Sequence, residues 1–221
     1  MTETVWEVGG EFHSPVETPR PFHPWPRPAV WYALGRHAVE ALVETRRLRT
    51  LWLPDYFCHE VAAGWADRVP LRTYEDDPRW PEPRWETLEA REGDAVVAVN
   101  FFGVRAGTGW AERKAGWLLV EDHSHDPFSP WAVGSQADFA FCSVRKTLPV
   151  PDGGILWSPR GLDLPPQPRG TAEGSELKLA AMLLKGRYLA AGGGNDLKER
   201  FRRLQLEGEE QLARSPVAAA S

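Results

Sequence analysis

The sequence lacks several features that mark particular classes of protein. It has only two cysteines, Cys58 and Cys142, which are too few for a disulfide framework. No apolar run approaches the ~18 residues that a membrane-spanning helix needs. Positive charge is not in excess either, since 31 acidic residues face 26 basic ones. A net charge of −5 argues against a nucleic acid or an anionic membrane as partner. We therefore expect a cytoplasmic globular protein that binds neither.

Proline, by contrast, is concentrated in the first thirty residues, at Pro15, Pro19, Pro21, Pro24, Pro26 and Pro28. A regular helix cannot tolerate this density of proline, because each ring removes a backbone donor and blocks the preceding turn. Acidic residues in the same stretch exclude a signal peptide. We expect residues 1–30 to form an extended arm that lies over the body or over a partner subunit.

Apolar runs and helical patterns alternate through the rest of the chain. Strands are expected at 51–53, 69–74, 95–101, 117–120, 137–142 and 155–158, and helices at about 36–49, 58–65, 110–114, 176–189 and 196–212. This alternation predicts a three-layer α/β/α fold with a mostly parallel mixed sheet. Because the turn after Lys146 is short, the last strand is expected to run antiparallel to its neighbour. The expected core spans 31–160, followed by C-terminal helices over 161–221.

Three finer expectations concern that C-terminal part. Leu177, Ala180, Leu184 and Tyr188 recur at helical spacing and predict the buried face of the first helix. Asp196 and Glu199 have the spacing of a capping box at the start of the second helix. The tail 215–221 is expected to fray.

The most informative stretch is 120–146, which places chemically active residues after two apolar runs. Asp122 follows the run 117–120, and Lys146 follows the run 137–142. If both runs are neighbouring parallel strands, the carboxylate and the amine emerge at the same edge of the sheet. In open α/β folds that edge is where ligands bind. An amine can hold an aldehyde cofactor, and a buried carboxylate can keep a pyridine nitrogen protonated.

Five short motifs occur in the order found in one enzyme family, over roughly residues 32–158. They are Gly35-Arg36-His37, Pro54-Asp55-Tyr56-Phe57, Asn100-Phe101-Phe102-Gly103, Glu121-Asp122-His123-Ser124-His125 and Ser143-Val144-Arg145-Lys146. With these motifs the chain resembles the fold-type I pyridoxal-phosphate (PLP) aminotransferases, and most closely the DegT-like sugar-aminotransferase branch. The resemblance implies PLP as the cofactor.

The resemblance also implies a role for each matched residue. Lys146 would form the Schiff base with the cofactor, and Asp122 would pair with its pyridine nitrogen. Phe57 would stack on the ring, and His125 would lie near the phenolic oxygen. The phosphate would be anchored by the turn that opens the first long helix and by a hydroxyl, which together involve Gly35, Arg36 and Ser143.

The implied reaction transfers an amino group from glutamate or glutamine to a keto sugar, with a nucleotide-linked sugar as one form of the acceptor. The family also implies a homodimer with small-molecule substrates. Its members are longer and carry a small C-terminal domain, which we expect to be missing here. An alternative is therefore a non-catalytic or partner-dependent PLP-binding domain.

Two rival interpretations use other residues of the same stretch. A Ser-Lys acyl enzyme would take Ser143 as nucleophile and Lys146 as base, but such enzymes place this motif at a helix start. A metal hydrolase would use His123, His125 and Asp126 with His59, although the spacing does not fix the ligand set. We expect no bound metal.

Overall fold

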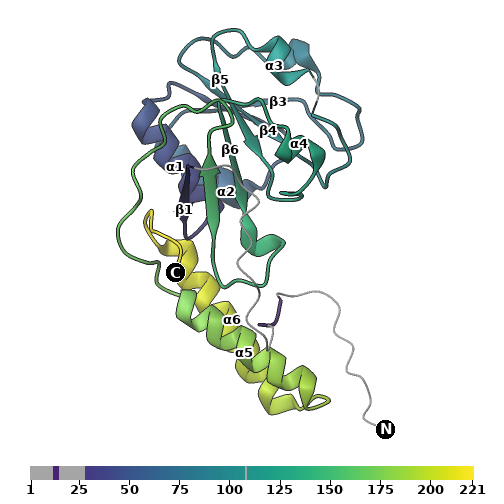
Figure 1. Ribbon diagram of the computed structural model, residues 1–221, viewed down its shortest axis with the longest axis vertical. Helices are drawn as coiled ribbons and strands as arrows, with labels where there is room; N and C mark the ends of the chain where they lie inside the picture. The colour runs from purple at the N-terminus through teal and green to yellow at the C-terminus, as the bar shows by residue number, and fades with distance from the viewer. Residues whose placement is uncertain (1–11, 15–27, 108) are drawn as a thin grey trace.

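The computed structural model describes residues 12–14, 28–107 and 109–221. Seven strands of this part form one sheet in the order β1-β7-β6-β5-β4-β2-β3 (Figure 1). Their bounds are β1 Ala29–Tyr32, β2 Leu51–Pro54, β3 Leu71–Tyr74, β4 Ala95–Val99, β5 Leu118–Asp122, β6 Phe139–Ser143 and β7 Gly154–Trp157. Most of the predicted arm lies outside the described residues, and β1 begins just before the expected core boundary.

The sheet is mostly parallel, as the sequence predicted. Adjacent members of the run β3, β2, β4, β5 and β6 pair in parallel, whereas β7 is antiparallel to both of its neighbours, β6 and β1. The short turn after Lys146 leaves no room for a crossover helix, so β7 must fold straight back along β6.

Helices cover both faces of the sheet, which confirms the three-layer α/β/α fold. On one face lie α1 (Gly35–Arg46) and α2 (His59–Ala66), and on the other lie two single-turn helices, α3 (Trp110–Arg113) and α4 (Pro130–Val133). Two short segments are 3-10 helices, η1 (Trp85–Thr87) and η2 (Val144–Lys146). The sequence did not predict α4, which is too short for an apolar period.

The central strand β4 reads Ala-Val-Val-Ala-Val, and every one of its residues is buried. Val97 and Val99 pack in the cluster with α1 and α2, while Val96 and Ala98 pack on the opposite side with Trp110 and other aromatic residues. A parallel strand covered on both faces needs such a continuous apolar run, since neither side meets water.

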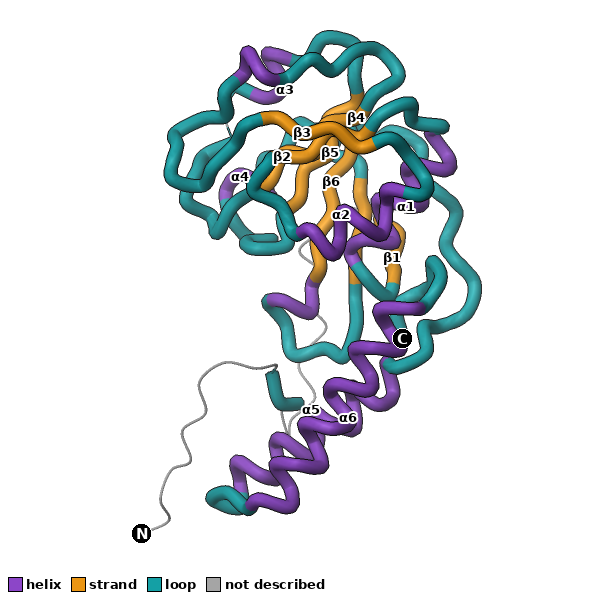
Figure 2. The backbone as a smooth tube through the Cα atoms, turned by 180° about the vertical axis from the view of Figure 1, so that it is seen from behind, coloured by secondary structure: helices purple, strands orange, loops and turns teal. Residues whose placement is uncertain are grey.

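The last two helices, α5 (Ser175–Ala190) and α6 (Asn195–Arg214), form an antiparallel hairpin that projects away from the sheet (Figure 2). The predicted capping box is wrong, because the residue before α6 is Gly194 and no side chain caps the helix. Of the four residues predicted for the buried face, only Tyr188 is buried, while Leu177, Ala180 and Leu184 are half-buried. The side of α5 that packs on α6 buries Lys178 and Lys185, whose long stems are apolar.

The tail 215–221 is not frayed, in contrast to the prediction. Ala218 is buried, and its carbonyl accepts a hydrogen bond from the Ala33 amide at 2.9 Å. The Ser221 amide donates to the Asp152 carboxylate at 3.2 Å. The tail thus satisfies backbone and side-chain groups beside β1, a role that composition alone does not reveal. Among the described helices, none has the length and apolar character to cross a membrane.

Candidate functional site

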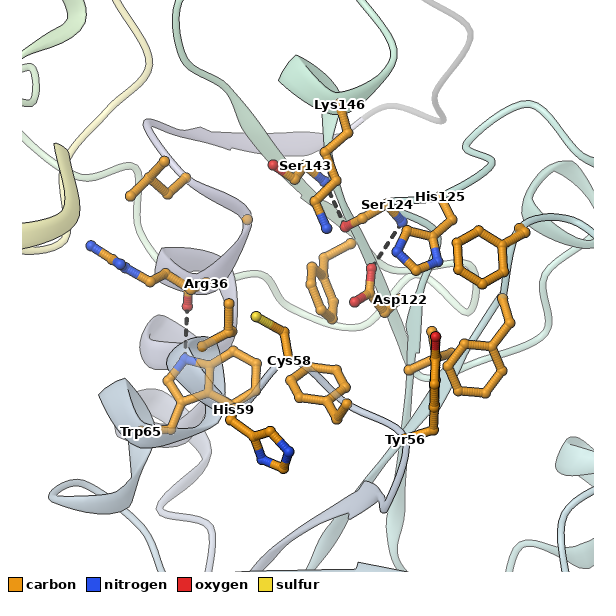
Figure 3. Close-up of a pocket in the computed structure, with 18 of the residues that line it drawn as sticks. Arg36, Tyr56, Cys58, His59, Trp65, Asp122, Ser124, His125, Ser143 and Lys146 are labelled. Carbon is orange, nitrogen blue, oxygen red and sulfur yellow. Dashed lines mark hydrogen bonds between the residues drawn. The ribbon is translucent and has the colours of Figure 1, made fainter. Parts of the chain in front are cut away.

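A cavity of about 460 Å³ opens at the edge where β4, β5 and β6 end. Its lining includes all seven residues that the sequence singled out for cofactor binding: Gly35, Arg36, Phe57, Asp122, His125, Ser143 and Lys146. They come from α1, the β2–α2 loop and the ends of β5 and β6. Figure 3 shows most of them around one space. The structure therefore brings together residues that lie up to 111 positions apart in the sequence.

Asp122 is the last residue of β5 and is 9% exposed. One of its carboxylate oxygens accepts a hydrogen bond from the Ser124 amide at 2.8 Å. Its other oxygen is directed toward the cavity (Figure 3) and has no hydrogen-bond partner among the described residues. A buried carboxylate with one oxygen to spare can accept a hydrogen bond from a ligand N–H.

Lys146 ends η2, three residues beyond β6. Its side chain extends toward Asp122 and His125 (Figure 3). Lys146 is nevertheless exposed, although it lines the cavity.

Ser124 joins the two strand ends that carry these groups. Beyond the register pair Asp122 and Phe141, the backbones are joined once more, by the His123 amide donating to the Phe141 carbonyl at 2.9 Å, and then separate. The Ser124 hydroxyl instead accepts the Ser143 amide at 2.9 Å, in a buried position. No role was predicted for Ser124 from the sequence, although a serine two residues after a strand-end aspartate is typical of a local turn.

The start of α1 lies directly against the end of β6. A Cβ atom placed on Gly35 would lie only 3.1 Å from the Ser143 Cβ, and a Cβ on Gly154 would overlap the backbone of Leu34 and Gly35. Glycine is therefore needed at position 154, while a side chain at position 35 would have to push Ser143 slightly aside. The first amides of a helix have no intrahelical partner and attract an anion.

Arg36 contributes to this end of the cavity through its backbone rather than its side chain. The guanidinium turns away and donates to the Leu212 and Ala213 carbonyls at the end of α6, at 3.0 and 2.6 Å. A second arginine of the lining, Arg145, forms a bidentate pair with Glu209 of α6 at 2.5 and 2.8 Å. Both arginines thus fasten α6 beside the site.

Aromatic rings make up much of the cavity wall. Phe57 packs beside Trp65, with 5.7 Å between ring centroids, and Tyr56 meets Phe101 edge-on at 5.5 Å. Phe102 stacks on His125 with centroids 4.4 Å apart and planes 6° from parallel. Phe102 is 57% exposed and adopts a φ of 53°, which is strained for a bulky side chain.

The pKa of His125 depends on its hydration and on the charges of Lys146 and Asp122. Its outer side is accessible, but the cavity wall reduces its hydration, and this lowers its pKa. The positive charge of Lys146 lowers the pKa further, while the negative charge of Asp122 raises it. All three side chains are therefore close enough to interact electrostatically.

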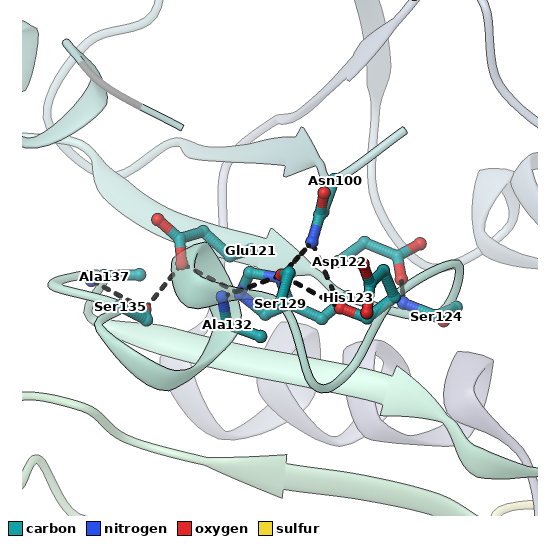
Figure 4. A network of polar contacts seen from close by, with 10 residues as sticks. Asn100, Glu121, Asp122, His123, Ser124, Ser129, Ala132, Ser135 and Ala137 are labelled. Atoms are coloured by element: carbon teal, nitrogen blue, oxygen red, sulfur yellow. Dashed lines mark hydrogen bonds and ion pairs between the residues drawn. The ribbon is translucent and has the colours of Figure 1, made fainter. Parts of the chain in front are cut away.

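The neighbouring residues Glu121 and His123 point to the opposite face of β5 (Figure 4). Glu121 bonds to His123 at 3.0 Å and accepts the Ser135 hydroxyl at 2.5 Å, while Asn100 contacts the other nitrogen of His123 at 3.3 Å. The residues of the metal rival are thereby separated, since His123 lies in this buried network and His125 in the cavity. No cluster of potential metal ligands occurs in the described part of the chain.

This chain is similar to known proteins in its three-dimensional structure rather than in its sequence. No family model matches the sequence, and no curated protein matches it. Among solved structures, the chain is similar to a DegT DnrJ EryC1 StrS aminotransferase from Brucella abortus, with 19% identity and a TM-score of 0.46 over 60% of this chain and 42% of that one. An aminotransferase from Psychrobacter cryohalolentis gives 14% identity and a TM-score of 0.46, over 59% of this chain and 37% of that one.

A Streptococcus pneumoniae protein described as a sugar aminotransferase, in its PLP form, gives 16% identity and a TM-score of 0.47 over 60% of this chain and 42% of that one. The chain thus spans less than half the length of each of these three structures. The DegT-like branch that the sequence motifs resemble is represented among them.

Proposed function

We propose that this chain is a PLP-binding, aminotransferase-like protein. The observation that carries the proposal is the placement of Lys146 and Asp122. An amine and a buried carboxylate reach one cavity from the ends of two neighbouring strands, with the start of α1 and Ser143 on the same cavity wall. Few ligands other than a planar aldehyde carrying an anionic group would use all of these features together.

The residues present fit PLP. The Asp122 oxygen directed into the cavity would accept a hydrogen bond from a protonated ring nitrogen. The close approach of Gly35 to Ser143 leaves a cradle of free helix amides beside a hydroxyl, which suits a phosphate. The aromatic wall, including Phe57, offers faces for a flat ring.

PLP, when bound, supplies an aldehyde that condenses with amines and a ring that accepts electrons. Lys146 would provide the amine and would carry protons to and from the reacting carbon. Asp122 would hold the ring-nitrogen proton, and the His125 imidazole would lie within reach of both groups. Reduced hydration, and then the charge of Lys146, lower the pKa of His125 and favour the neutral imidazole, which can accept or donate one hydrogen bond.

For substrates, we propose glutamate or glutamine as donor and a keto sugar, free or nucleotide-linked, as acceptor. A homodimer and a cytoplasmic location stay predictions from the sequence. The alternative of a partner-dependent PLP-binding domain is favoured by one observation, the exposure of Lys146. An amine that meets water needs a further cover before it can act in a dry site.

The experiment is to incubate the purified chain with PLP, record the visible absorbance and reduce with borohydride. We expect a visible band that reduction removes, and a mass increase on the peptide that contains Lys146. Lys146→Ala should lose both signals. Lys114→Ala is the matched control, because Lys114 is paired with Asp138 at 2.5 Å outside the cavity, and it should keep both.

The two candidate functions then separate in a second measurement. If the band appears and glutamate abolishes it with release of 2-oxoglutarate, the chain transfers amino groups by itself. A band that no amino donor changes supports the partner-dependent binding domain. If the native chain gives no band and no labelled Lys146, the proposal of a PLP site is wrong.

A further inference from the structure

We propose that Ser124 is a positioning residue that sets the separation of Asp122 and Lys146 through one hydroxyl group. This inference rests on the proposed function, because it concerns the same cavity. The side chain of Ser124 lies between these two residues, and the family resemblance implies no role for it.

The strands β5 and β6 diverge just beyond their last register pair. Their backbone register ends at the pair Asp122 and Phe141, after which one more backbone bond joins the His123 amide to the Phe141 carbonyl at 2.9 Å. The Ser143 amide lies beyond this point and finds its acceptor in the Ser124 hydroxyl at 2.9 Å. A side chain thus replaces the missing backbone partner at the point where the strands separate.

Ser124 is also tied to Asp122 on its other side. Its amide donates to the Asp122 carboxylate at 2.8 Å, so one residue contacts the carboxylate through its backbone and the amine-bearing segment through its side chain (Figure 3). Ser124 is only 4% exposed, so water cannot readily take over its bonds. A buried amide without an acceptor costs free energy. The Ser143 amide is therefore held firmly against the Ser124 hydroxyl.

The far end of the same segment is held from elsewhere. The Val144 amide donates to the Gly153 carbonyl at 3.0 Å, and Arg145 is fastened to Glu209. These contacts fix η2 to β7 and to α6, but they do not connect it to β5. Among the described residues, the Ser124 hydroxyl is the side-chain link between the strand that carries Asp122 and the start of the segment that carries Lys146.

The test is the variant Ser124→Ala, which removes the hydroxyl but keeps the amide that donates to Asp122. The matched control is Ser158→Ala. The Ser158 hydroxyl likewise accepts a backbone amide, that of Leu162 at 2.8 Å, but it lies outside the cavity. Thermal unfolding of both variants without cofactor checks that each one folds.

Two properties are measured on the wild type and on both variants. The first is the affinity for PLP, which we expect to weaken about tenfold in Ser124→Ala, the loss typical of one buried hydrogen bond. The second is the titration of His125 by NMR in the cofactor-free protein. If Lys146 moves away from His125, its positive charge lowers the His125 pKa less, and the pKa rises. Ser158→Ala should match the wild type in both.

Each outcome decides the proposal. A weaker affinity together with a raised His125 pKa supports it. Unchanged values in Ser124→Ala overturn it, and so does a weaker affinity with an unchanged His125 titration, since the hydroxyl would then be a cofactor contact rather than a spacer. If the wild type binds no PLP, the proposed function fails, and the His125 titration alone decides whether Ser124 sets the spacing.

Discussion

The segment Glu121–His125, at the end of β5, places a carboxylate and a histidine on each side of the sheet. One pair is bonded inside the protein, and the other borders the cavity. On one face, Glu121 and His123 are bonded to each other and to Ser135 and Asn100, inside the protein. On the other, Asp122 uses one oxygen within the protein, and His125 stands at the edge of a cavity. A carboxylate and an imidazole are thus bonded within the protein on one side and accessible from a cavity on the other.

Within the five residues Glu121–His125, we therefore distinguish side chains that stabilise the fold from side chains that are available to bind a ligand. A closed polar network stabilises the fold, because each buried group would cost free energy if it lost its partner. A group left open at a cavity adds little to stability and remains available to a ligand. We therefore expect substitutions on the closed face to affect unfolding and those on the open face to affect binding.

The largest effect is expected for Glu121→Ala on the closed face. It leaves the ring of His123 and the hydroxyl of Ser135 without their buried acceptor, and we expect the free energy of unfolding to fall by about 3 kcal/mol. Chemical denaturation measures this. Glu121→Gln keeps an acceptor and should lose less, and equal losses in the two variants would contradict the role of these hydrogen bonds.

On the open face, Asp122→Asn should change the free energy of unfolding by less than about 1 kcal/mol, because the amide carbonyl can still accept the Ser124 amide. The affinity for PLP should drop roughly tenfold or more, since a charged acceptor is exchanged for a neutral one. Absorbance titration follows the binding. A variant that unfolds as readily as Glu121→Ala would break the contrast between the faces.

The pH behaviour of His125 sharpens the comparison further. Reduced hydration and then Lys146 lower its folded pKa, while Asp122 opposes the shift. Lys146→Ala should raise the pKa of His125, and Asp122→Asn should lower it, as NMR titration can measure. Because the folded pKa lies below the unfolded value of ~6.5, His125 favours the folded state above that value. This contribution declines as the pH falls through the folded pKa.

The smallest change is expected for Phe102→Gly. The variant loses the ring that stacks on His125 but relieves a φ of 53°, so the two effects oppose each other. The free energy of unfolding should shift by less than ~1 kcal/mol. Better hydration should move the His125 pKa up toward its ordinary value. A large loss of stability would mean that Phe102 belongs to the core rather than to the cavity rim.

Much of the body could be predicted from the sequence, because its signals are local. The run Ala95–Val99 is apolar without interruption and rich in valine, which is typical of a strand buried on both faces. The alternation of such runs with helical patterns gave the mixed sheet, and the strand-end positions of Asp122 and Lys146 gave their common edge. The C-terminal part was harder. The buried face of α5 includes two lysines, which a hydrophobic pattern does not recognise as core.

The sequence by itself determined the layered α/β fold and the set of residues at one edge, since strand direction and burial follow from periodicity. Tertiary structure alone decided which side of β5 each polar side chain takes into a closed network, where Arg36 points, and that Lys146 meets water. It also decided that the Ser124 hydroxyl bridges two strands. These features depend on contacts between segments far apart in the chain, whose distances no local pattern encodes.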